Sequence, residues 1–420
     1  MACEATIGNR RHRFGPTSHP TFSDAPLRVF VASEPLPTFP GWSYAETHCH
    51  SWQTSNQVEF GAPPLLLAQM AQALGLRWVL ITDHSFDLAM PSDLADPLET
   101  QDRWERLGQE IEEANRSVPG VRLIRAQEVS CGSAKGTNLH LLVYALERRL
   151  PGSGDSLYGR KLIDHRPDSW LAELVEEVHA AGGLAFASHP FTAIGRMEGR
   201  LLNRSVWGQE DLSLPHLTGW EFWNTEHPGH FQAARAAWIQ GLREGLRPVA
   251  IAGSDAHGDF NRSRAISLPF LRVCEAFDEA FGKPRTAVET PNGTEAELYS
   301  ALREGRAVLS NGPIACIELH TERRQYPMGS AVQEESGTLI VHARSSSEFG
   351  PLRRVTLYAA RIGAQEERET VLGRRLGYSA EFRVALTVRE RPAYVRVEAI
   401  AEREGRTTYA LTNPIWFDKR

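Results

Sequence analysis

Short apolar runs of strand length alternate with longer amphipathic runs between residues 44 and about 256. The amphipathic runs at 63–75, 169–183 and 231–245 repeat their apolar positions every three or four residues, which predicts helices. The apolar runs predict strands at 77–83, 122–128, 139–145, 183–189, 219–224 and 248–255. This alternation indicates an α/β fold built on a parallel sheet, either open or closed into a barrel.

The pattern changes after about residue 310. A last helix is predicted at 294–306, and beyond it strand-length runs follow one another with turn residues between them, which is typical of an all-β sandwich. We therefore expect an N-terminal extension at 1–40 with one candidate strand at 28–33, a barrel domain at 41–308 and a β-sandwich domain at 309–420.

Composition adds limits on partners and compartment. Of the 420 residues 41% are hydrophobic and 23% charged, as in a globular protein, and the net charge of −6 is mixed along the chain, which disfavours nucleic acid or a membrane as the main partner. The five cysteines lie far apart without a Cys-x-x-Cys spacing, which fits a cytoplasmic protein without disulfides. No apolar run approaches the ~18 residues of a membrane span, so neither a span nor a secretion signal is expected.

Histidine and carboxylate side chains gather where the predicted strands end. These residues are His48, His50, Asp83, His84, Glu128, His189, Asp255 and His257, with His140 at the beginning of the run at 139–145. The carboxyl ends of parallel barrel strands meet at one mouth, so we expect these side chains to become neighbours.

Imidazoles and carboxylates are ligands for divalent cations, and Glu128 is the natural bridge between two of them. A single histidine after a strand is more often structural, but repetition at nearly every strand end favours a metal site. Six further histidines are expected to be structural or solvent-facing, namely His12, His19, His165, His179, His216 and His320, whereas His227 and His230 stay open as substrate contacts. Cys49 should point away from its histidine neighbours on a strand and is rejected as a nucleophile.

The motifs T-H-C-H-S, T-D-H-S, Q-E-V, N-L-H-L-L, S-H-P and G-S-D-A-H, in this order over residues 44–258, resemble the polymerase and histidinol phosphatase (PHP) superfamily of metallohydrolases. The C-terminal segment is similar to the carbaryl-hydrolase-like branch. The resemblance implies a distorted seven-stranded (β/α)7 barrel, followed here by the sandwich, with two or three divalent ions (Zn, Mn or Fe) at its mouth.

The resemblance also implies a ligand set for each ion. His48, His50, Glu128 and Asp255 would hold the first ion; Glu128, His140 and His189 the second; His84 and His257 the third. The sequence has Ser55 and Asn56 where the family's fullest pattern has a further ligand, so Asn56 or Glu59 substitutes there, or the third site is half-occupied or empty. Asp83 is expected to orient the imidazole of His84.

Such a site indicates a hydrolase in which a water between two cations attacks phosphorus or a carbonyl carbon, with Glu128, Asp255 and His257 as the catalytic residues. We expect a phosphoesterase acting on a small phosphomonoester or phosphodiester, with Arg196, Asn224, Arg262 and Arg264 as candidate substrate contacts. Two alternatives stay open: hydrolysis of a carbamate, carboxyl ester or amide, with the aromatic run at 220–223 lining the pocket, and a non-catalytic scaffold. A small-molecule substrate is the expected partner, and a homo-oligomer is compatible with the sequence.

Overall fold

The computed structural model describes residues 3–7, 10–14, 31–54, 61–89, 102–156, 164–258, 265–268, 271–274, 280–334, 336–386 and 392–418. The predicted site residues Asn56, Glu59, Arg262 and Arg264 lie outside these ranges. The candidate strand at 28–33 lies partly outside them, and its described residues 31–33 are not in a strand.

One half of the N-terminal part is a five-stranded sheet. Its order is β10 (Val249–Ala252), β9 (Gly219–Trp223), β8 (Leu184–Ala187), β7 (Asn138–Tyr144) and β6 (Gln127–Gly132). The pairs β8–β9 and β9–β10 are parallel, but β7 runs antiparallel to both of its neighbours. The turn at 133–137 joins β6 to β7, and it is far shorter than the dozen or more residues that a parallel crossover needs.

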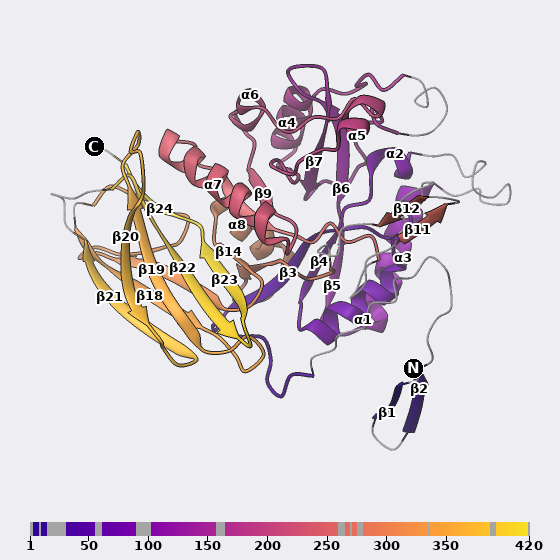
Figure 1. Ribbon diagram of the computed structural model, residues 1–420. Helices are drawn as coiled ribbons and strands as arrows, with labels where there is room; N and C mark the ends of the chain where they lie inside the picture. Colours follow the sequence, from indigo (N-terminus) through magenta and orange to yellow (C-terminus); the bar gives the residue numbers. More distant parts are fainter. Residues whose placement is uncertain are drawn as a thin grey trace.

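The other half belongs to an eleven-stranded mixed sheet that continues into the C-terminal part (Figure 1). Its N-terminal strands are β3 (Trp42–Cys49), β4 (Trp78–Ile81), β5 (Arg122–Arg125), β13 (Arg285–Glu289) and β14 (Ala307–Ser310). Its C-terminal strands are β17 (Ala331–Val332), β19 (Leu352–Ala360), β20 (Arg368–Arg374), β22 (Tyr394–Arg403), β23 (Arg406–Thr412) and β24 (Ile415–Phe417). The connection is the antiparallel pair β14–β23.

A four-stranded antiparallel sheet packs beside the C-terminal strands. Its order is β16 (Gln325–Pro327), β15 (Ile314–His320), β18 (Gly337–Arg344) and β21 (Ser379–Leu386). Two further two-stranded sheets are formed by β1 (Cys3–Ile7) with β2 (Arg10–Phe14), and by β11 (Ala265–Leu268) with β12 (Leu271–Cys274).

Helices connect and cover the N-terminal strands. They are α1 (Pro64–Leu74), α2 (Ser85–Leu88), α3 (Arg103–Ser117), α4 (Leu171–Ala180), α5 (Arg196–Leu201), α6 (Gln209–Leu212), α7 (Pro228–Glu244) and α8 (Glu295–Glu304). The predicted helices at 63–75, 169–183, 231–245 and 294–306 correspond to α1, α4, α7 and α8. Gly75, Gly245 and Gly305 end three of them in the left-handed conformation that glycine adopts without strain. None of the described helices is long and apolar enough to cross a membrane.

The predicted (β/α)7 barrel with a separate sandwich is wrong. Over the described residues the structure is 37% strand and 22% helix, arranged in large mixed and antiparallel sheets. The antiparallel direction of β7 breaks the parallel order, and β14 lies between β13 and β23, so one sheet runs through both parts of the chain. β14 also crosses residue 308, at which the sequence predicted a domain boundary; that division stays a prediction.

One apolar core spans the two parts. Buried side chains form a continuous cluster from Leu67 on α1 and Val79 on β4 to Val341 on β18 and Val397 on β22. Burial of such side chains is the main stabilising contribution to a fold of this size. The C-terminal strands therefore support the N-terminal sheets that carry the histidines.

Candidate metal centre

The structure brings the predicted histidines and carboxylates together. One group contains His48, His50, Glu128 and Asp255, a second contains His84, Glu128 and His140, and a third contains His50, His84 and His257. Within each group the candidate ligand atoms lie within 4.8 Å of one another. Such buried groups of imidazoles and carboxylates could hold metal ions.

β3 and its end supply two ligands of the first group. Alternation along the strand places His48 and His50 on one face and Cys49 on the other, where its Sγ lies 3.7 Å from the carbonyl oxygen of Leu80. The Nε2 atoms of His48 and His50 are 3.3 Å apart, and each lies 3.1 Å from Oδ1 of Asp255. The first group is the ligand set that the resemblance implied for the first ion.

Glu128 on β6 lies between the groups. Its Oε1 is 3.0 Å from Nδ1 of His140 and 3.2 Å from Nε2 of His189, while its Oε2 is 3.0 Å from Nδ1 of His84. Although Oε2 is buried and close to His84, it accepts no hydrogen bond from the residues that the structure describes. Buried polar atoms are nearly always hydrogen-bonded, so a buried carboxylate oxygen without a hydrogen bond fits a cation as its partner.

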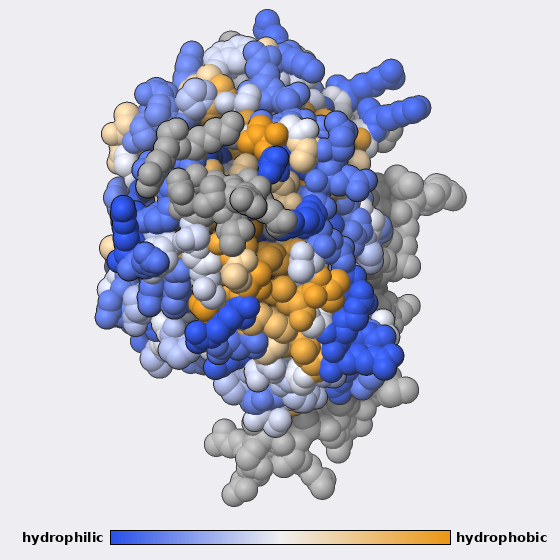
Figure 2. All heavy atoms as spheres, turned by 90° about the vertical axis from the view of Figure 1, so that its left-hand side faces the viewer, coloured by the Kyte–Doolittle hydropathy of each residue, from blue (hydrophilic) through white to orange (hydrophobic). Residues whose placement is uncertain are grey.

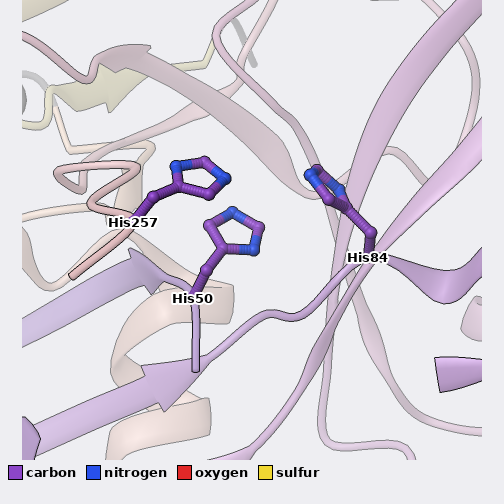
Figure 3. A group of neighbouring side chains, drawn as sticks. All are labelled: His50, His84 and His257. Atoms are coloured by element: carbon purple, nitrogen blue, oxygen red, sulfur yellow. The ribbon is translucent and has the colours of Figure 1, made fainter. Parts of the chain in front are cut away.

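The third group is the one drawn in Figure 3. The rings of His50 and His257 stack with their centroids 4.1 Å apart, and the ring of His84 lies across from them, with its centroid 4.6 Å from that of His50. The Nδ1 atom of His257 lies 2.9 Å from the carbonyl oxygen of Asp255, which orients this ring. The resemblance implied His84 and His257 for the third ion, and the structure adds His50 to them.

The electrostatics favour positive charge at the centre. Burial opposes ionisation of Glu128, but His140, His48 and His84 outweigh it and hold the pKa of this carboxyl well below its usual range. Burial also opposes a charged His48, yet Glu221, Asp255 and Glu128 raise its pKa well above the usual value. By contrast, burial lowers the pKa of His50 to about 4, so this imidazole is neutral at pH 7, as a metal ligand must be.

Two of the candidate ligands have strained backbone angles. His189 and Asp255 have φ angles of 30° and 52°, in the left-handed region that residues other than glycine rarely adopt. Such conformations cost roughly 1–3 kcal/mol and cluster at functional sites. Gly253 permits the close approach of β3 to the end of β10, because a Cβ there would lie 2.6 Å from Cβ of His48 and from Oε1 of Glu221.

Three residues that support the ligands were not predicted from the sequence. Glu221 on β9 is fully buried and lies 3.0 Å from Nδ1 of His48, so it fixes the imidazole with Nε2 toward Asp255. Asp155 lies 2.7 Å from Nε2 of His140 and accepts a hydrogen bond from Nε of Arg204 at 2.6 Å. A carboxylate inside the apolar run at 219–224 was a signal for Glu221, since carboxylates are rarely buried without a partner. Asp155 belongs to a glycine-rich loop, and no pattern pointed to Arg204.

Asp83 has partners other than the predicted one. Its carboxylate accepts hydrogen bonds from the backbone N–H of Ser51 at 2.7 Å and from the hydroxyl of Thr54 at 2.8 Å. The Thr54 hydroxyl oxygen in turn lies 3.2 Å from Nδ1 of His50. The carboxylate therefore orients His50 through Thr54.

A cavity of about 160 Å³ opens onto the centre. Besides site residues its lining includes Asn138, Ile194, Arg204, Val206, Trp207 and Asn224. Of the candidate substrate contacts, Asn224 therefore faces the cavity, whereas Arg196 is exposed at the start of α5 and is not among the described lining residues. The aromatic residues Trp220, Phe222 and Trp223 are buried in the core instead.

The remaining histidines lie away from the described cavity lining. His179 and His216 stack on the surface with ring centroids 3.8 Å apart, and His320 pairs with Glu318. His227 and His230 are exposed at the beginning of α7, where His227 caps the helix. His165 is half-buried, and its carbonyl oxygen accepts a hydrogen bond from Asn138. His19 and the side chain of His12 are outside the described part of the chain.

No protein-family model matches the sequence. No curated protein matches it either.

Proposed function

We propose that this protein is a metal-dependent hydrolase whose preferred substrates are small phosphoesters. The observation that carries the proposal is the pair of buried groups that share Glu128, with Arg204 in the adjoining cavity. The six ordered motifs that resemble the PHP superfamily support it, and membership of that superfamily is part of the proposal.

The residues fit two or three divalent cations. His48, His50, Glu128 and Asp255 would hold one cation, Glu128 with His140 and His189 or His84 another, and His84 with His257 and His50 a third. Bound cations supply Lewis acidity, which activates water at neutral pH and polarises the oxygen of the substrate. Glu221 and Asp155 orient His48 and His140, and these contacts keep the ligand nitrogens in place.

Arg204 favours an anionic substrate. Its Nη2 lies 3.0 Å from Nε2 of His140, so its guanidinium stands beside the proposed ligands and lines the cavity. Guanidinium groups bind phosphoryl oxygens through parallel charge-assisted hydrogen bonds. The cavity volume of about 160 Å³ accommodates a phosphoryl group, and Asn224 adds an amide to the cavity lining.

A second candidate function is hydrolysis of an aryl carbamate or carboxyl ester. Three apolar residues of the cavity lining, Ile194, Val206 and Trp207, favour it, because such side chains would accept an aromatic group. Both candidates use the same ligands.

Turnover by the metal-loaded protein distinguishes the candidates. The panel contains aryl phosphomonoesters, aryl phosphodiesters, aryl carbamates and aryl carboxyl esters with the same leaving group. We expect the highest kcat/KM with a phosphoester. Hydrolysis of carbamates or esters without phosphoester turnover would make the second candidate correct, and a metal-loaded protein that turned over none of them would favour a scaffold role.

A further inference from the structure

One long edge of β21 has no strand beside it among the residues that the structure describes. The strand occupies the end of the four-stranded sheet, and all eight of its residues pair with β18 on one side. On its other side no described strand pairs with it. A regular, unpaired edge of this length is a template for another strand.

Apolar side chains from β20, from β21 and from the connection between them lie beside this edge. β20 ends at Arg374, and the chain crosses to β21 at Ser379, so the two consecutive strands form edges of different sheets. Here the apolar core ends in half-buried side chains, which we call the open end of the core: Leu372, Leu376, Phe382, Val384 and Leu386. Figure 2 faces that side of the molecule and shows an apolar patch surrounded by hydrophilic side chains.

The outward face of β21 carries two opposite charges. Glu381 and Arg383 are two residues apart on this face, with side chains 51% and 72% exposed. Within the chain they contact each other at 3.3 Å, between Oε1 of Glu381 and Nε of Arg383. If two copies of this strand ran antiparallel with Phe382 opposite Phe382, Glu381 would face the partner's Arg383, and the symmetry would form this pair twice.

We propose that β21 pairs antiparallel with β21 of a second copy of this chain, centred on Phe382. The two four-stranded sheets then join into one sheet of eight strands. In this register the inward side chains also match, since Phe382 meets its counterpart and Ala380 meets the partner's Val384. Direct cross-strand pairs of aromatic residues and of opposite charges both stabilise antiparallel sheets.

The charge arrangement selects a second copy over an unrelated strand. A foreign strand would have to present the opposite sequence of charges, whereas two-fold symmetry supplies it automatically from Glu381 and Arg383. The register also brings Leu386 to the partner's Tyr378, which is 52% exposed in the single chain. Pairing would thus cover the open end of the core with the same apolar row from the second copy.

Sedimentation and light scattering of charge-reversal variants test the interface. The wild type should be a dimer, and Glu381→Arg or Arg383→Glu alone should raise the dissociation constant roughly tenfold or more, because each places two like-charge pairs in the interface. An equimolar mixture of the two variants should form a heterodimer, since their charges are complementary in this register. The double variant, Glu381→Arg with Arg383→Glu, should dimerise as the wild type does.

A matched control uses the exposed pair Arg353 and Glu402, 3.3 Å apart on strands β19 and β22. Arg353→Glu should leave the dimer unchanged. Three results would overturn the proposal: a wild type that is monomeric up to roughly 100 µM, single reversals that leave the dissociation constant unchanged, or a mixture of the reversed variants that fails to associate. Circular dichroism of each variant verifies that it is folded.

Discussion

The carboxylate of Glu128 lies against the imidazole of His140, with Oε1 and Nδ1 3.0 Å apart, across the antiparallel strands β6 and β7. Because β7 runs in the opposite direction, the beginning of this strand lies where the parallel strands end. His140 therefore joins the other candidate ligands although it is near the start of its strand. The second oxygen of the same carboxylate lies 3.0 Å from Nδ1 of His84 and 3.5 Å from Nε2 of both His48 and His50. Glu128 therefore connects two of the three ligand groups.

The contact between Glu221 and His48 predicts a specific loss of metal affinity. Glu221→Gln keeps the size of the side chain but removes the charge that holds the His48 imidazole with Nε2 toward Asp255. We expect metal affinity to fall roughly 10- to 100-fold, as when other carboxylate partners of ligand histidines are replaced. Competition with a fluorescent chelator measures this affinity. Glu173→Gln, on the exposed face of α4, is the control, and equal affinities for the wild type and Glu221→Gln would refute the orienting role.

The position of Arg204 in the cavity lining predicts that replacing it affects charged substrates more than neutral ones. Arg204→Gln should lower kcat/KM for a phosphoester by roughly 10- to 100-fold, which corresponds to one hydrogen bond to a charged group. The value for a neutral ester with the same leaving group should change much less. Arg200→Gln on the exposed face of α5 is the matched control, and metal content reports whether the centre survives. An equal reduction with both substrates would contradict a phosphate-binding role.

The C-terminal part contains a buried cluster of ion pairs, and replacing the arginine at its centre should destabilise the fold. Arg396 is fully buried and donates to Glu367 from Nε at 2.8 Å, and it also contacts Glu398, which accepts from Arg235 at 2.7 Å. Arg396→Met should reduce the free energy of unfolding by about 3–5 kcal/mol, because it leaves buried carboxylates without their partner. Urea denaturation measures the difference. Arg353→Met, at an exposed ion pair, should change stability by less than about 1 kcal/mol.

The same cluster predicts how stability changes with acid. Burial raises the pKa of Glu398, but Arg396 and Arg235 outweigh it and the net shift is downward. A depressed pKa in the folded state contributes stability that is present above the unfolded-state value and is lost as the pH falls through the folded-state value. The difference between wild type and Arg396→Met should therefore shrink as the pH is lowered below about 4. A difference that stayed constant over that range would show that Glu398 does not titrate with unfolding.

Much of the site could be predicted because its ligands follow a local rule. His48, His50, His84 and Asp255 come at or just after strand ends, and apolar runs identify those strands without any knowledge of their partners. Glu221, Asp155 and Arg204 could not be placed in this way, because their roles depend on contacts between segments 15 to 173 residues apart in the chain.

The sheet arrangement was harder to predict than its strands. An apolar run indicates a strand but not its direction, and the short connection between β6 and β7 was the only signal that β7 is antiparallel. The pairing of β14 with β23 joins segments about a hundred residues apart, and nothing in either run specifies it. The sequence therefore did not indicate that one sheet continues from the N-terminal strands into the C-terminal strands.

Metal content tests the central claim most directly. Elemental analysis would be made on protein purified without chelator or metal-affinity resin, for the wild type, Glu128→Ala, His140→Ala and the surface control Glu173→Ala. We predict two or three equivalents of zinc, manganese or iron in the wild type and in the control, and fewer in both site variants, with the larger loss for Glu128→Ala because Glu128 belongs to two groups. A folded wild type that contained no metal and took up none on reconstitution would contradict the metal-dependent hydrolase.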